Sequence, residues 1–123
     1  MYTYPNGINR QKEMKTNNEI NGQVPWTGIA DFIDAEMPPN AIGIVARVVT
    51  FAANAKSFEE KVRKLQDEAG GELTYIEEAV LVTHFLRNEA FPESEIFEML
   101  EQAKKHPDDV IFGEYHYYTL DDA

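Results

Sequence analysis

Cysteine is absent from this 123-residue chain, and basic residues are scarce: 11 Lys and Arg stand against 22 Asp and Glu, a formal net charge of -11. The absence of cysteine excludes disulfide frameworks, thiolate catalysis and cysteine-based zinc or iron–sulfur sites. The shortage of basic residues argues against direct binding of DNA or RNA, because a nucleic-acid-binding face needs Lys and Arg to release counterions from phosphates. A basic protein surface is the better partner.

Long apolar runs are also missing. The longest strongly apolar stretch, 41–53, is interrupted by Arg47 and is too short to cross a bilayer. The N-terminus shows no basic segment followed by an apolar one, as a secretory leader would. We therefore expect neither secretion nor membrane insertion, and a cytoplasmic location.

The chain contains none of the common catalytic or nucleotide-binding motifs. There is no Gly-x-x-x-x-Gly-Lys loop, no Gly-x-Gly-x-x-Gly and no Gly-x-Ser-x-Gly elbow. His84, His106 and His116 do not show the His-Glu-x-x-His spacing that places two metal ligands on one helical face. Adjacent carboxylates such as Glu59 and Glu60 are typical of solvated helix faces. We expect no metal, no cofactor and no enzyme activity.

The apolar content of 43% is enough for one modest core, so we predict a single folded domain between an N-terminal arm and a C-terminal tail. Residues 1–24 contain five asparagines and few apolar side chains, which indicates a flexible arm. Residues 25–106 are predicted to form a helical domain. Residues 107–123 form an acidic aromatic tail, predicted either to lie extended on the core or to act as a docking peptide.

Helical spacing dominates the middle of the chain. Ile29, Phe32 and Ile33 predict a short helix after Trp26, which would end before the Met-Pro-Pro-Asn segment at 37–40. Residues 41–55 are apolar nearly all round, and their length favours a buried helix. Their β-branched residues would also suit a strand.

Two capping-box patterns predict a central helical hairpin. Ser57 to Glu60 opens a helix that would run from Phe58 to Ala69 and end at a glycine pair. Thr74 to Glu77 opens a longer one, predicted to reach about Ala90. A further helix is expected at 93–105, after Pro92. The fold class predicted from the sequence is therefore all-α, with four to five helices.

The predicted helix 74–90 has apolar residues on more than one stripe. Tyr75, Ala79, Val82 and Leu86 define one line, whereas Leu81 and Phe85 point elsewhere. Either a second helix of this chain or a binding partner would have to cover the second stripe.

Four segments between residues 57 and 100 resemble a known family. They are the run from Phe58 to Leu65, the run from Thr74 to Ala79, Phe85-Leu86-Arg87-Asn88-Glu89, and Phe91-Pro92-Glu93-Ser94. Their order and gaps are similar to those of the late-transcription coactivators of T-even-like bacteriophages. Members of that family are small, acidic, helical, non-enzymatic proteins that bind the flap of the bacterial RNA polymerase β subunit and connect it to the phage sliding clamp.

The resemblance implies a partner and a candidate surface. The partner would be the RNA polymerase β-subunit flap, and the residues we assign to the flap-facing surface are Tyr75, Ile76, Val80, Leu81, Phe85 and Phe91. The family ends in a short apolar clamp-binding peptide. This chain instead ends in polar residues after Leu120, so clamp binding is not carried over.

Three functions follow as hypotheses. The first is a non-catalytic, phage-type regulator that binds host RNA polymerase, with acidic residues steering its approach to basic patches. The second is an acidic inhibitor or DNA mimic, of the anti-restriction or anti-CRISPR type, directed at a nucleic-acid-binding enzyme. The third is an oligomeric virion assembly chaperone.

Overall fold

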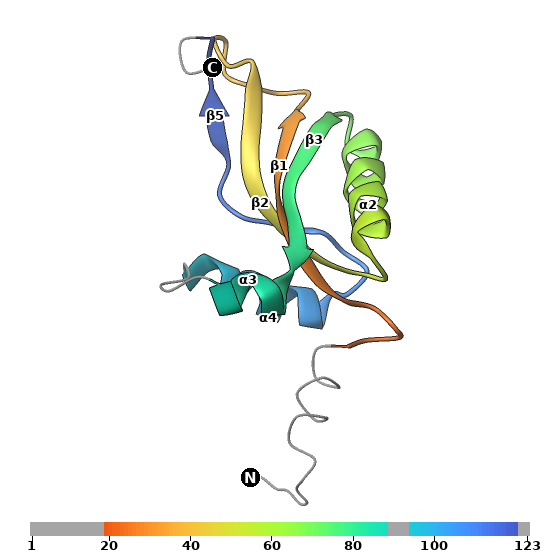
Figure 1. Ribbon diagram of the computed structural model, residues 1–123. Helices are drawn as coiled ribbons and strands as arrows, with labels where there is room; N and C mark the ends of the chain where they lie inside the picture. The colour runs from red at the N-terminus through yellow and green to blue at the C-terminus, as the bar shows by residue number, and fades with distance from the viewer. Residues whose placement is uncertain (1–18, 89–93, 121–123) are drawn as a thin grey trace, which may run out of the picture.

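The computed structural model describes residues 19–88 and 94–120, and it shows a mixed α/β fold (Figure 1). The prediction of an all-α domain is wrong. In chain order the elements are β1 (Val24–Ile33), β2 (Gly43–Ala52), α2 (Ala55–Glu68), β3 (Glu72–Leu81), α3 (Val82–Asn88), α4 (Ser94–Lys105), β4 (Ile111–Phe112) and β5 (His116–Tyr118).

The strands form one antiparallel sheet in the order β3-β1-β2-β4, and β5 also pairs with β2. β1 and β2 make a long hairpin in which Phe32 lies opposite Ile44 and Val24 lies opposite Ala52. Two register shifts between β1 and β3 each place one extra residue in β3. Such bulges, together with Glu72 and Glu77, blunt the exposed edge of the sheet against pairing with another chain.

The central strands explain why two predicted helices are wrong. Residues 26–33 lie in β1, and most of 41–55 lies in β2. Both faces of β2 are covered over much of its length, so its apolar residues follow one another without a polar alternation. A doubly buried strand and a buried helix then share the same composition, and the β-branched residues of β2 favour the strand that the structure shows.

The predicted helical hairpin is also wrong. Its first helix exists as α2, but it begins earlier than predicted. The N-cap is Asn54 and not Ser57, and the Asn54 side chain accepts a hydrogen bond from the Ser57 amide at 2.8 Å. Gly70, with φ +85, ends that helix. The segment predicted as the second helix begins as strand β3 and becomes helical only at α3, while residues 89–93 lie outside the described part. The helix predicted at 93–105 is confirmed as α4.

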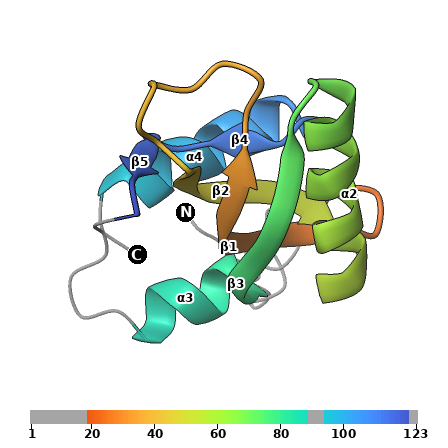
Figure 2. The ribbon, with the colours of Figure 1, turned by 90° about the horizontal axis from the view of Figure 1, so that it is seen from above.

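The helices cover the two faces of the sheet unequally. Figure 2 shows α2 on one side of the sheet and α3 and α4 on the other. Beneath α2, Phe58 and Val62 are fully buried against a core of Ala30, Phe32, Ile44, Ala46, Val48, Ala52 and Leu73. Burying each of these two side chains stabilises the fold by roughly 1.5–3 kcal/mol.

On the opposite face, α3 and α4 pack over one end of the sheet only. Their core contains Val49, Phe51, Val82, Ile96, Met99 and Ala103. No helix of the described residues lies over the other end of that face, where the early part of β2 meets the late part of β1 (Figure 1). This uncovered half of the sheet is the candidate functional surface.

Candidate partner-binding surface

Cross-strand pairing identifies the side chains on the uncovered half of the sheet, which we call the open face. Directly opposed residues of antiparallel strands project to the same side. Asp31 lies opposite both Val45 and Tyr75, and Ile29 lies opposite both Arg47 and Glu77. With Ile33 and the β5 residues opposite β2, the open face comprises Ile29, Asp31, Ile33, Val45, Arg47, Tyr75, Glu77, His116 and Tyr118.

A nearly buried carboxylate lies at the centre of the open face. Asp31 is 7% exposed, and its Oδ1 accepts a hydrogen bond of 2.7 Å from the Tyr118 hydroxyl. Tyr75, which is 46% exposed, lies directly opposite Asp31 on the neighbouring strand β3. Gly43 provides the space for this arrangement, because a Cβ there would collide with the Tyr118 ring. The Asp31 side chain therefore joins β1 to β5, with Tyr75 of β3 beside it.

The acidic surroundings raise the pKa values of both phenols, which are protonated at neutral pH. The hydrogen bond to Asp31, with burial and the charge of Asp31 adding to it, raises the pKa of Tyr118 to about 12. The charge of Glu77, followed by that of Asp31, raises the pKa of Tyr75. Protonated phenols act as hydrogen-bond donors and aromatic contact surfaces, which suits binding better than proton transfer near pH 7.

Arg47 is the cation of the open face. Its guanidinium lies 4.5 Å from the centroid of the Phe85 ring, and Nη1 donates to the Thr27 hydroxyl at 3.2 Å. The Thr27 hydroxyl in turn donates to the Val48 carbonyl at 2.9 Å. The side chain is thus fixed by a ring on one side and a buried hydroxyl on the other.

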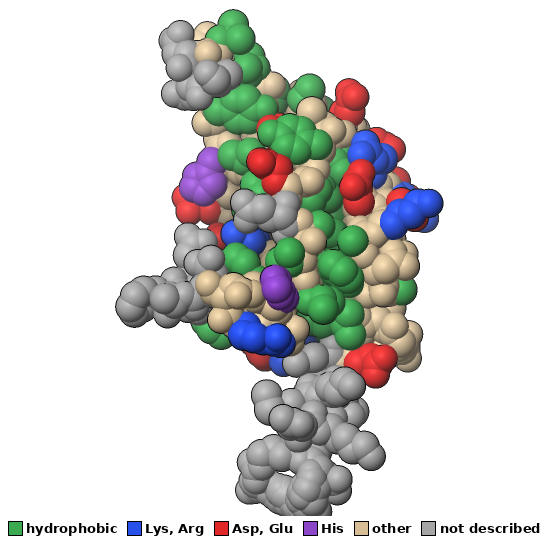
Figure 3. Space-filling model, in the orientation of Figure 1, with side chains coloured by type: hydrophobic (Ala, Val, Ile, Leu, Met, Phe, Trp, Pro, Cys, Tyr) green, Lys and Arg blue, Asp and Glu red, His purple; other side chains and the backbone are tan. Residues whose placement is uncertain are grey.

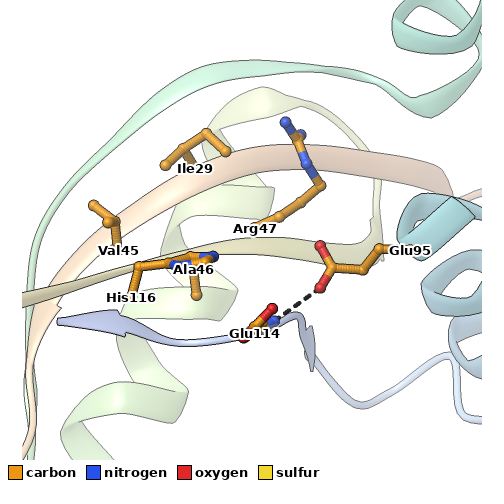
Figure 4. Close-up of a pocket in the computed structure, with 7 residues that line it drawn as sticks. All are labelled: Ile29, Val45, Ala46, Arg47, Glu95, Glu114 and His116. Carbon is orange, nitrogen blue, oxygen red and sulfur yellow. Dashed lines mark hydrogen bonds between the residues drawn. The ribbon is translucent and has the colours of Figure 1, made fainter. Parts of the chain in front are cut away.

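A pocket of about 220 Å³ adjoins Arg47 (Figure 4). Ile29 and Val45 supply apolar walls, and Glu95 enters from the first turn of α4. Glu95 Oε2 accepts a 2.9 Å hydrogen bond from the Glu114 amide, which ties α4 to the segment between β4 and β5. The complete lining is Ile29, Val45, Ala46, Arg47, Glu95, Glu114 and His116.

The fold places the five described residues of the predicted surface on different faces. Tyr75 lies on the open face, and Val80 is half-buried opposite the buried Thr27. Ile76 packs on the α2 side of the sheet, and Leu81, which is 36% exposed, lies opposite Trp26, a residue that packs against the same core. Phe85 is half-buried beneath Arg47. Phe91 lies outside the described residues.

Sequence reasoning missed Asp31, Arg47 and Tyr118. The signal that would have found them is the alternation along β1 and β2, where 29, 31 and 33 share one side and 45 and 47 share the corresponding side. That alternation is hidden because the intervening residues are also apolar.

Acidic side chains outnumber basic ones on this surface. Asp31, Glu77, Glu95 and Glu114 place four carboxylates on or beside the open face, against the single guanidinium of Arg47. In Figure 3 hydrophobic side chains form a band along the strands towards α3, beside the charged surface of α2.

Within residues 19–88 and 94–120, no three His, Asp or Glu side chains group as metal ligands, and no helix could span a membrane.

No protein family model, curated protein or solved structure matches this chain.

Proposed function

We propose that this chain is a non-catalytic regulator that binds a basic surface of a host protein through the open face. The observation that carries the proposal is the uncovered sheet half, where Tyr75 and Ile33 are 46% and 40% exposed beside a nearly buried carboxylate. Exposed tyrosine and isoleucine around a desolvated polar group resemble the centre of a protein interface. The net charge of -11 favours approach to a positive patch.

The partner we propose is the bacterial RNA polymerase β subunit, in the cytoplasm of a bacterial host cell. Its support is the resemblance of residues 57–100 to the phage late-transcription coactivators. The anchor cannot be the helical hairpin predicted for that region, because most of its second half is strand β3. The open face takes the place of that hairpin in the proposal.

A pull-down of purified polymerase at low and high salt tests the proposal. Tyr75→Ser and Ile33→Ser should each weaken retention by about tenfold, because they remove central apolar contacts. Leu81→Ser is the matched control, since Leu81 is also exposed but lies on the other face of the sheet. All variants are first shown to be folded by circular dichroism.

The outcomes separate the alternatives. Polymerase retained at high salt and lost only with the open-face variants supports the proposal. Loss of polymerase retention with Leu81→Ser alone would indicate an interface on the α2 side of the sheet. Absence of retention by the wild-type chain at low salt would rule out polymerase. Strongly salt-sensitive capture of a purified nuclease in its place would favour the DNA-mimic function, because a mainly ionic interface is screened.

A further inference from the structure

Arg47 occupies an unusual position for a charged residue. It lies in the middle of β2, which pairs with β1 on one side and with β4 and β5 on the other. Its backbone carbonyl accepts a 2.8 Å hydrogen bond from the Gly113 amide. An arginine in a central strand loses part of its hydration, a cost that a group of opposite charge can offset.

Among residues 19–88 and 94–120, no carboxylate forms an ion pair with the Arg47 guanidinium. In the described part of the chain the ion pairs are Arg63 with Glu59 and Lys104 with Glu101, and neither includes Arg47. Glu95 lines the same pocket, yet its carboxylate is turned to the Glu114 amide and makes no ion pair with Arg47 within 4.0 Å. Among the described residues, one of the five N–H donors of the guanidinium, on Nη1, has a protein acceptor.

The contacts to Phe85 and Thr27 limit the rotation of this side chain. A donor fork that is fixed before binding loses less conformational entropy when a ligand arrives, and it suits the planar geometry of a carboxylate. The adjoining pocket has Ile29 and Val45 as apolar walls, so an entering carboxylate would meet Arg47 in partly desolvated surroundings.

From this arrangement we infer that the Arg47 pocket receives a carboxylate side chain of the protein partner, from an Asp or Glu flanked by basic residues. The acidic groups around the pocket, Glu77, Glu95 and Glu114, select the basic neighbours, and Arg47 selects the acid between them. The inference rests on the proposed function, because it specifies which segment of a basic partner surface the open face accepts. Mixed charge of this kind sets the orientation of binding and rejects uniformly basic surfaces.

Two short probe peptides test the inference without knowledge of the partner. Acetyl-Lys-Glu-Lys-amide carries the proposed pattern, and acetyl-Lys-Gln-Lys-amide lacks only the carboxylate. Titration into the full-length isotope-labelled chain is followed by nuclear magnetic resonance, including the Arg47 Nε–H signal. The Glu peptide should bind about tenfold more tightly and shift that signal. Non-specific attraction to a chain of charge -11 would favour the Gln peptide, which is the more positive.

Variants of the arginine complete the test. Arg47→Gln should abolish the preference for the Glu peptide, and Arg47→Lys should retain part of it, since a lysine keeps the charge but not the fork. Arg87→Gln, at an exposed arginine of α3, should leave the preference unchanged. Equal binding of the two peptides at the open face overturns the inference and leaves the proposed function standing. Tighter binding of the Gln peptide, or shifts located away from Arg47, also overturns it.

Discussion

Asp31 links the strands of the open face at the scale of a single side chain. Asp31 is 7% exposed, and its carboxylate accepts a hydrogen bond from the Tyr118 hydroxyl of β5. Removing the donor would leave a desolvated carboxylate unsatisfied. The free-energy cost of such a loss is larger for a charged group than for a neutral one. We therefore expect this contact to help hold the short strand β5, which also pairs with β2, in the sheet.

Tyr118→Phe tests that dependence. The variant should be less stable by about 1 kcal/mol at pH 7, because one hydrogen bond to Asp31 is lost. Urea unfolding measures the change through the fluorescence of Trp26, the only tryptophan, which stacks on Phe58 with ring centroids 6.4 Å apart. Unchanged stability would show that the hydroxyl does not hold β5.

The same variant carries a pH prediction. The pKa of Tyr118 is raised from 10.0 to about 12 in the folded chain, so the neutral phenol is the form that folding favours. The stabilisation is complete below pH 10 and is lost as the pH rises towards 12. Absorbance titration of phenolate should show a late-titrating tyrosine in the wild type that is missing in Tyr118→Phe. A late step that persists in the variant would assign the raised pKa to another residue.

At the scale of the element, β3 shows how a strand can imitate a helix. Leu73, Ile76 and Ala79 all pack towards the α2 side, three residues apart. In a regular strand such residues would be two apart, but each of the two bulges in β3 adds one residue to the interval. The resulting spacing matches one helical face, which is why the sequence pattern at 74–90 favoured a helix.

A matched pair of substitutions tests the orientation of β3. Ile76 packs against the α2-side core, whereas neighbouring Tyr75 is exposed on the open face. Ile76→Ser should lower the free energy of unfolding by about 2–3 kcal/mol, and Tyr75→Ser by about 1 kcal/mol or less. Chemical denaturation of both variants gives the comparison. Equal losses would contradict the alternation that the structure assigns to this strand.

The attachment of α2 rests partly on one lysine. Lys61 Nζ donates to the Phe51 carbonyl at 2.9 Å and to the Pro107 carbonyl at 2.8 Å, so it joins α2 to β2 and to the segment before β4. Burial lowers the pKa of this lysine, and the nearby Asp108 and Asp109 oppose that effect.

Lys61→Met should therefore destabilise the chain by about 2 kcal/mol, because two carbonyls lose a charged donor while the apolar stem is kept. Lys64→Met, at an exposed position of the same helix, serves as the control and should change stability by less than about 0.5 kcal/mol. Thermal and urea unfolding give both values. Similar losses of stability in the two variants would show that the loss of a positive charge, and not the two hydrogen bonds of Lys61, causes the effect.

At the scale of the whole molecule, the formal net charge of -11 opposes the compact state through repulsion among carboxylates. Raising the ionic strength from about 0.01 M to about 0.15 M shortens the Debye length from about 30 to about 8 Å. We expect the midpoint of thermal unfolding to rise by roughly 3 °C over that range. Sucrose at equal osmolality controls for general solute effects, and a fall in the midpoint with salt would contradict the expectation.

The sequence by itself determined the parts of this protein that depend on local contacts. α2 and α4 were predicted because their apolar residues form one stripe, although α2 begins at Ala55, before the capping box predicted at Ser57. The excess of acids was equally plain, and it led to the expectation of a basic protein partner, which stays a prediction. These features depend on residues close together in the chain.

Only the tertiary structure decided the sheet and the open face. Asp31, Arg47, Tyr75 and Tyr118 come from four strands, and their meeting depends on the register of those strands. Register is set by packing and by the bulges of β3, which local spacing does not reveal. For the same reason the five described residues of the surface predicted around Tyr75 lie on different faces: consecutive residues of a strand alternate between faces, whereas residues three or four apart in a helix share one.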